Sequence, residues 1–312
     1  MTSRQSLTDL IRSMYEVFPF PNCEYERTQG MQLAMYFAKQ AKKSGSRSLL
    51  AEGVSVVDCG CGTGSTIIPI AKAYPQSQFL GVDMTSKSLE IATQAAKDQG
   101  VTNISFVQAD LQTFDLKRKF DVVLNFGVLI VVADPMAALE RLTAHVAPEG
   151  RLVLWLYGTH GRYKLRLNQR AMALLTKDTD EWKERMEIGK RALAHLPRKH
   201  WDCYFSVPTY KLENKFEEGF DWIQTNESWI ADQFLHPHEK SFEMEGILDM
   251  FDKVGLRFDH WIGVDTDVTN YTEDEDLRAR VRALPERDRL LFFDLLHKPV
   301  DYFVVGRHKD AK

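Results

Sequence analysis

The sequence has few cysteines, no long apolar run and no excess of basic residues. Four cysteines in 312 residues, with no C-x-x-C pair, are too few for a disulfide framework and lack the spacing of a structural zinc site. No apolar run approaches the roughly 18 residues that span a bilayer, so we expect no membrane span. The first residues lack a basic segment followed by a continuous apolar one, which argues against a secretory signal. These absences predict a cytoplasmic protein with reduced thiols.

The charge balance bears on the kind of partner that the chain can bind. A formal net charge of -4 argues against a nucleic-acid partner, because neutralising phosphates requires a basic surface. Residues 183–200 are locally basic and residues 273–276 are acidic, and we interpret both as solvated helix faces. The hydrophobic fraction of 44% is typical of a globular chain that buries a sizeable core.

Apolar runs bounded by glycine and acidic residues alternate with stretches of helical periodicity, which predicts an α/β core. The expected strands are residues 55–59, 78–82, 104–108, 121–125 and 151–157, with helices over 85–99 and 135–146. Beyond residue 157 the rhythm breaks, and two amphipathic helices followed by an aromatic stretch predict a mainly helical inserted cap. The rhythm resumes with a helix over 241–254, a strand over 256–262, a helix over 277–296 and a strand over 300–306.

The N-terminal segment precedes this pattern and is expected to form a helical lid. Two helices near residues 3–18 and 27–43 flank the segment FPFPNCEYE, whose prolines disfavour regular structure. The predicted organisation is a lid over residues 1–45, a core over 46–160 and 230–312, and a cap over 161–229.

The strongest local signal is the segment VVDCGCGTG at residues 56–64. A buried strand ends in Asp58 and runs into three glycines at alternate positions. Glycine permits unusual backbone angles and lets the main chain approach a ligand closely, which predicts a nucleotide-like ligand at this turn. A dinucleotide fingerprint would need a glycine where this chain has Ser65, which disfavours a nicotinamide dehydrogenase.

Two further acids follow later strands. Asp83 ends the second strand about 20 residues after the glycine turn, where its carboxylate can accept hydrogen bonds from both hydroxyls of a ribose. Asp110 ends the third strand and could accept a bond from an adenine amino group, with Met84 and Leu111 packing on the ring. Each acid alone is more typical of a helix cap. Their joint order indicates one site along a single sheet edge.

With these residues taken together, the sequence resembles the class I S-adenosylmethionine-dependent methyltransferase family over about residues 50–157, and the strands expected over 256–306 match the same pattern. The resemblance implies a Rossmann-like, doubly wound, mostly parallel seven-stranded sheet with S-adenosyl-L-methionine as the cofactor. It implies that Asp58 and the glycine turn hold the methionine end, Asp83 the ribose and Asp110 the adenine. The cofactor-binding residues predicted in this way are Asp58, Gly60, Cys61, Gly62, Gly64, Asp83, Met84, Asp110, Leu111, Asn125, Phe126 and Gly127.

The fourth strand departs from the family in a way that bears on catalysis. Many relatives carry histidines after the G-V-L of this segment, whereas this chain has Ile130 and Val131. The strand also lacks the N-P-P-Y type of sequence that holds a planar amide or an exocyclic amine, which disfavours methylation of adenine or glutamine. A general base from this part of the chain is therefore absent.

The acceptor side of the site is predicted from residues outside these motifs. Histidine suits proton transfer near neutral pH, and the candidates are His236, His160 and His238. The H-P-H spacing has no accompanying cysteine or carboxylate constellation, so we expect no metal. Arg162 or Arg166 could bind a substrate carboxylate. The candidate substrate-binding residues are Tyr15, Phe20, Tyr25, Tyr157, Arg162 and Tyr163.

Several functions remain open at this point. The leading hypothesis is methyl transfer to an oxygen, nitrogen or carbon of a small or medium-sized metabolite enclosed by the cap. A protein or RNA methyltransferase would instead need an open groove beside residues 183–200. A regulatory subunit that binds the cofactor without catalysis is the third reading. Motifs do not encode the methyl acceptor or the oligomeric state.

Overall fold

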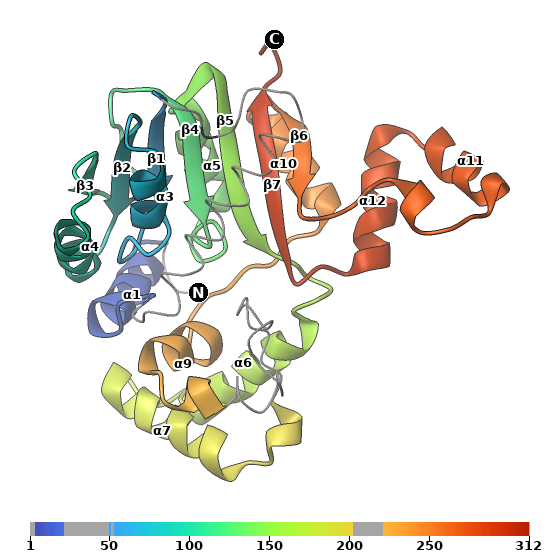
Figure 1. Ribbon diagram of the computed structural model, residues 1–312. Helices are drawn as coiled ribbons and strands as arrows, with labels where there is room; N and C mark the ends of the chain where they lie inside the picture. The colour runs from blue at the N-terminus through green and yellow to red at the C-terminus, as the bar shows by residue number, and fades with distance from the viewer. Residues whose placement is uncertain (1–3, 22–49, 51–52, 202–220, 312) are drawn as a thin grey trace.

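The computed structural model describes residues 4–21, 50, 53–201 and 221–311 (Figure 1). Its centre is a seven-stranded sheet with the order β3-β2-β1-β4-β5-β7-β6. The pairs formed by β1 to β5 are parallel, whereas β7 runs antiparallel to both β5 and β6. The sheet confirms the predicted Rossmann-like, mostly parallel seven-stranded fold.

The strands lie close to their predicted positions. They are β1 Ser55–Cys59, β2 Gln78–Asp83, β3 Ile104–Gln108, β4 Phe120–Phe126, β5 Val146–Tyr157, β6 Leu256–Ile262 and β7 Asp301–His308. The largest difference is β5, which begins at Val146 because this residue already pairs with Phe120 ahead of a register shift. The sequence signal is strong for the central strands, because a sheet that is buried on both faces needs continuous apolar runs.

Helices cover both faces of the sheet. Val56 and Val57, which point to opposite faces of β1, belong to two different buried clusters. One cluster includes α3 Ile67–Ala73 and α4 Ser86–Asp98, and the other includes α5 Pro135–Ala144, α10 Met244–Lys253 and α12 Glu286–His297. Figure 1 shows these two layers on either side of the strands. The arrangement is the doubly wound one that the sequence predicted.

The helix expected over residues 277–296 is two helices, α11 Glu275–Ala283 and α12. Pro285 lies at the N-cap of α12, and Leu284 before it adopts an extended conformation, with ψ of 140°. The ring of a proline disfavours helical geometry in the preceding residue, which explains the break. A short 3₁₀ turn, η3 Val268–Asn270, precedes α11.

The remaining helices form a separate layer below the carboxyl ends of the strands (Figure 1). They are α1 Arg4–Val17, α6 Tyr163–Leu175, α7 Trp182–His195, the 3₁₀ turn η1 Arg198–His200 and α9 Glu227–Phe234. A third buried cluster joins α1 to α6, α7 and α9, so the N-terminal helix shares a hydrophobic core with the cap. We expected the core to resume at residue 230, but α9 spans that position and packs within the cap layer.

Two sequence predictions concern other parts of the chain. The second N-terminal helix, expected over residues 27–43, lies outside the described residues. Within the described ranges, no helix combines the length and the apolar character that crossing a bilayer requires.

Candidate active site

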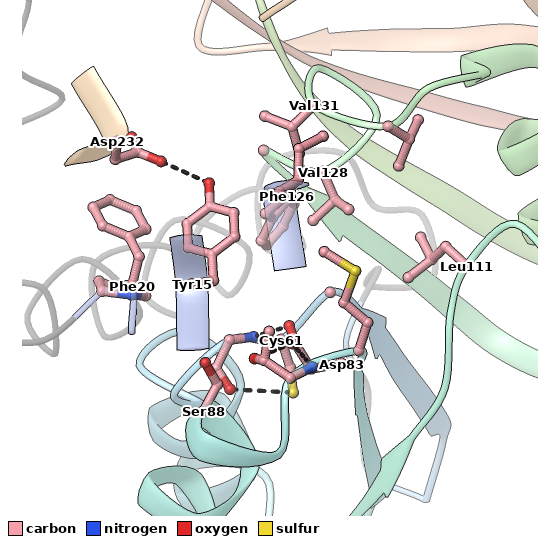
Figure 2. A pocket seen from close by; sticks show the side chains of 18 of the residues that line it. Tyr15, Phe20, Cys61, Asp83, Ser88, Leu111, Phe126, Val128, Val131 and Asp232 are labelled. Atoms are coloured by element: carbon pink, nitrogen blue, oxygen red, sulfur yellow. Dashed lines mark hydrogen bonds between the residues drawn. The ribbon is translucent and has the colours of Figure 1, made fainter. Parts of the chain in front are cut away.

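A pocket lies where the carboxyl ends of β1, β2 and β4 meet the cap layer. The order of the strands reverses between β1 and β4, and such switch points are where ligands bind in doubly wound sheets. The pocket lining includes most of the predicted site residues: Tyr15, Phe20, Asp58, Gly60, Cys61, Gly62, Asp83, Met84, Asp110, Leu111, Phe126, Gly127, Tyr157 and Arg162. Figure 2 labels lining residues that come from the core, from α1 and from the cap.

The glycine turn that follows β1 forms the floor of the pocket. The backbone nitrogens of Gly60 and Cys61 both donate to the carbonyl oxygen of Val82, at 2.6 and 2.9 Å, and close the turn onto β2. Gly60 has a φ of 92°, and a Cβ there would lie 2.2 Å from Cγ2 of Val128. A Cβ at Gly62 would lie 2.4 Å from the carbonyl oxygen of Phe20. Only glycine fits at these two positions, because a side chain at either one would clash with its neighbours.

Asp58 places at the pocket a buried carboxylate whose Oδ1 has no hydrogen-bond partner among the described residues. The residue is 2% exposed, and its Oδ1 makes no hydrogen bond within the described structure. Burial, and secondarily the charge of Asp83, raises the pKa of Asp58 to about 7. A buried carboxylate is costly unless it is paired, so this position suits a cationic or hydrogen-bond-donating group of a ligand.

Asp83 is held firmly at the end of β2. Its Oδ2 accepts a hydrogen bond from the backbone nitrogen of Gly62 at 2.9 Å. Its Oδ1 accepts from both the backbone nitrogen and the hydroxyl of Thr85, at 2.9 and 2.7 Å. Burial raises the pKa of Asp83, and these bonds counteract the rise. The carboxylate therefore has a fixed orientation toward the pocket.

Asp110 follows β3 and lines the far side of the pocket. Its Oδ1 accepts from the backbone nitrogen of Gln112 at 2.9 Å, and its Oδ2 lies 3.8 Å from Nη2 of Arg12 on α1. The structure thus gathers Asp58, Asp83 and Asp110 around one cavity.

The helix α1 is fixed over the pocket by contacts that the sequence analysis missed. The carboxylate of Glu16 accepts hydrogen bonds from the backbone nitrogens of Ser86 and Lys87, at 2.9 and 3.3 Å. These donors are at the start of α4, where the helix dipole favours a negative charge. Nε2 of Gln112 donates to the hydroxyl of Thr8 at 2.8 Å. Helix α1 is therefore part of the wall of the site.

On the cap side, Asp232 and Gln233 of α9 line the pocket, and neither was predicted. Asp232 is 8% exposed; its Oδ1 accepts from the hydroxyl of Tyr15 at 2.9 Å, and its Oδ2 accepts from Nε2 of Gln233 at 2.7 Å. Burial raises the pKa of Asp232 to about 6, although both hydrogen bonds lower it. The only signal in the sequence is an acid and an amide inside the otherwise apolar segment WIADQF.

Arg162 lines the pocket, but its positive charge is already paired with a carboxylate of the protein. Its Nη2 lies 2.9 Å from Oε2 of Glu239, and the two side chains are 2% and 5% exposed. Its guanidinium carbon lies 3.4 Å from the centre of the Tyr157 ring. Arg166 donates to the hydroxyl of Ser241 at 2.7 Å. Arg162 lies in the lining as expected, but in this structure its guanidinium pairs with Glu239, so it has no unpaired charge to offer a substrate carboxylate.

The three candidate histidines do not line the pocket, which differs from the sequence prediction. Nδ1 of His236 accepts from the backbone nitrogen of His238 at 3.1 Å, and burial lowers the pKa of His236 to about 3. The Nε2 atoms of His160 and His238 are buried with no hydrogen-bond partner in the described structure. The His236 ring lies 5.9 Å from the ring of Tyr15, behind the lining of the pocket, and none of the three imidazoles is part of that lining.

The other predicted residues outside the lining have structural roles or lie on the surface. Asn125 is fully buried, donating to the carbonyl of Cys59 at 2.7 Å and accepting from the backbone nitrogen of Leu129 at 3.1 Å. A Cβ at Gly64 would meet Ile68, so this glycine allows α3 to pack. Tyr163 is 62% exposed. Tyr25 lies outside the described residues, and among those that are described no group of three metal-binding side chains occurs.

Comparisons with known proteins agree with this geometry. A family model described as a methyltransferase domain matches residues 50–206, just over half of the chain. An uncharacterised protein of Synechococcus sp. is 25% identical over 309 residues, covering 96% of this chain and 71% of its own. A trans-aconitate 2-methyltransferase of Azoarcus sp. is 23% identical, covering 69% of this chain and 81% of its own.

The solved structure of PKMT2 from Rickettsia typhi in complex with AdoHcy superposes with a TM-score of 0.64 at 18% identity. The match covers 91% of this chain and 54% of that one, so this chain spans about half the length of that relative. At this identity the likeness is one of fold.

Proposed function

Because this chain belongs to the class I S-adenosylmethionine-dependent methyltransferase family, we propose that it methylates an oxygen, nitrogen or carbon atom of a small or medium-sized metabolite. S-adenosyl-L-methionine is its cofactor. The residues at the ends of β1, β2 and β3 would hold this cofactor, together with Phe126 at the end of β4 and Gly127 directly after it.

The observation that carries this proposal is the buried Oδ1 of Asp58 beside the glycine turn, which has no hydrogen-bond partner among the described residues. The ammonium of a methionine group provides the partner that this buried acid lacks. The glycines allow the backbone to approach the same group closely. Asp83 and Asp110 line the same pocket, where they could accept hydrogen bonds from the ribose and the adenine. The residues therefore fit the cofactor.

The sulfonium supplies an activated methyl group, and the protein has to orient a nucleophile in line with it and exclude water. The layer formed by α1 and the cap helices serves both needs, because α1 and α9 close the side of the pocket that faces away from the sheet. The hydrophobic walls include Phe126, Trp155 and Trp229. A pocket of this kind favours a small acceptor over a macromolecule.

Incubating the purified protein with isotopically labelled S-adenosylmethionine and a metabolite extract tests the proposal. We expect a small molecule to gain a labelled methyl group. Label found only on protein or RNA would support the macromolecular alternative. Cofactor binding without any labelled product would instead favour a non-catalytic regulatory subunit.

Replacing Asp83 by alanine is expected to weaken binding of S-adenosylhomocysteine by roughly 1–3 kcal/mol, the cost of losing a buried polar partner. Calorimetric titration measures the effect. The matched control is Asp178→Ala, because the Asp178 side chain is 87% exposed on the cap. An unchanged affinity in Asp83→Ala would refute the ribose assignment.

A further inference from the structure

The cap side of the pocket combines aromatic walls with one buried acid. Phe20 and Trp229 contact each other edge to face, with ring centres 5.3 Å apart, and both line the pocket with Phe126 and Trp155. The acid is Asp232, whose hydrogen bond to Tyr15 is drawn in Figure 2 on a different side of the pocket from Asp83. Flat apolar surfaces beside one small group of polar side chains centred on Asp232 are suited to an aromatic molecule that carries one polar substituent.

The charges around this region discriminate against an anionic acceptor. Four carboxylates line the pocket, those of Asp58, Asp83, Asp110 and Asp232. Arg162 is the one lysine or arginine in the described lining, and it is already paired with Glu239. A carboxylate-bearing acceptor would face Asp232, and among the described lining residues no unpaired lysine or arginine would compensate its charge. Like charges in such proximity are strongly unfavourable.

Asp232 also has the features of a proton acceptor. Tyr15 donates a hydrogen bond to its Oδ1, and Gln233 donates one to its Oδ2. These two bonds fix the carboxylate and leave a free acceptor position on each oxygen. Burial and the electrostatic effect of Asp232 raise the pKa of Tyr15 well above its ordinary value, so Tyr15 stays a donor. The histidines that could compete for this role lie outside the lining.

We propose that the methyl acceptor is a largely apolar aromatic molecule with an uncharged phenolic hydroxyl, and that the carboxylate of Asp232 accepts the proton of this hydroxyl. The inference rests on the proposed function and names its acceptor. The hydroxyl oxygen forms a bond to the methyl carbon, the bond from that carbon to sulfur breaks with its electron pair going to sulfur, and the proton passes to Asp232. A phenol suits this step better than an alkyl alcohol, because it is far more acidic.

The groups that face Asp232 set the direction of its pH dependence. Tyr15 on α1 and Gln233 on α9 donate to it, Arg162 lowers its pKa, and Glu239 raises it. Because its pKa is about 6, the carboxylate is ionised at neutral pH and becomes protonated as the pH falls toward 5. Acidification therefore removes the charge that repels anions.

The test uses two probes that differ only in the polar group, 1-naphthol and 1-naphthoate. Each is titrated calorimetrically into the S-adenosylhomocysteine complex of the full chain at about pH 7.5, where naphthol is neutral and naphthoate is anionic. We expect naphthol to bind about tenfold tighter or more. In Asp232→Asn the preference should fall to within about threefold, because the amide carries no charge, while the control Asp178→Asn should retain it.

A change of pH gives a second test. At about pH 5 naphthoate is still anionic but Asp232 is largely protonated, so the preference for naphthol should shrink in the wild type. Because Asp58, with a pKa of about 7, is protonated over the same range, the decrease should be clearly larger in the wild type than in Asp232→Asn. In the labelled-extract experiment, a methyl group on a phenolic hydroxyl supports the inference, and a methyl ester overturns it.

The outcomes separate this inference from the proposed function. Failure to bind S-adenosylhomocysteine would count against the proposed function itself. If the cofactor product binds but neither probe does, or naphthoate binds as tightly as naphthol, the acceptor assignment is overturned while the family assignment stands. If the preference for naphthol over naphthoate is unchanged in a folded Asp232→Asn variant, Asp232 is not the group that selects the acceptor.

Discussion

Replacing Asp58 by asparagine is expected to stabilise the ligand-free protein above pH 7 and, at the same time, to weaken cofactor binding. Burial raises the pKa of Asp58 from 3.8 to about 7, so ionising this carboxylate in the folded state is unfavourable. Each pKa unit corresponds to about 1.4 kcal/mol, so the gap of about three units sets an upper limit of about 4 kcal/mol on the gain. Asparagine has a similar shape and no charge to bury.

The sign of the pH dependence follows from proton uptake. Asp58 holds its proton more tightly in the folded than in the unfolded chain, so the folded state binds more protons between about pH 4 and 7. The free energy of unfolding of the wild type therefore falls as the pH rises through this range and levels off above it. The Asp58→Asn variant should lack this contribution, while the smaller one from Asp232, in the same direction, persists in both proteins.

Urea unfolding of both proteins at about pH 5 and about pH 8 measures the stability difference, and calorimetry with S-adenosylmethionine measures the loss of affinity. The exposed Asp178→Asn serves as the control. A variant that is no more stable than the wild type at pH 8 would contradict the burial argument. A variant with undiminished affinity would contradict the pairing of Asp58 with the methionine ammonium.

Replacing Arg162 by methionine is expected to lower the free energy of unfolding by about 3–5 kcal/mol, which is typical of breaking a buried ion pair on one side. The substitution leaves the carboxylate of Glu239 buried without its cation, and Tyr157 loses the guanidinium that lies over its ring. Methionine keeps most of the side-chain volume, so the loss should reflect charge more than packing. Urea unfolding at neutral pH measures it.

Two comparisons isolate the buried charge. In the double variant Arg162→Met with Glu239→Leu, much of the stability should return, because no unpaired charge remains. Arg287→Met breaks a surface pair with Asp249, whose side chain is 54% exposed, and should cost at most about 1 kcal/mol. If Arg162→Met costs no more than Arg287→Met, the ion pair with Glu239 does not have the stabilising role inferred here.

Much of the core was predictable because its signals are local. The strands at Ser55–Cys59, Ile104–Gln108 and Leu256–Ile262 have their predicted bounds, since each is a short run enclosed by turn residues. The glycines after β1 and the acids after β2 and β3 line the pocket together, because the carboxyl ends of parallel strands meet at one edge. The break between α11 and α12 also has a local cause, Pro285, but the sequence analysis predicted one helix there because apolar residues recur at helical spacing on both sides of it.

The acceptor side of the site shows what local patterns cannot specify. The hydroxyl of Tyr15 and the carboxylate of Asp232 meet although they are 217 positions apart in the chain. Arg162 has a carboxylate partner 77 positions away, which cancels the role that its charge suggested. The candidate histidines were chosen because they lie near strand ends in the sequence, yet none of them lines the cavity.

By itself, the sequence determined the positions of the strands along the chain, the glycine turn after β1 and the acids that line the pocket. These features depend on the backbone preferences and polarity of residues that are close together in the chain. Only the tertiary structure decided which polar side chains α1 and α9 bring into contact, and which carboxylates are buried deeply enough to change their pKa. Burial and pairing depend on every element that surrounds a group, and most of those elements are distant in the sequence.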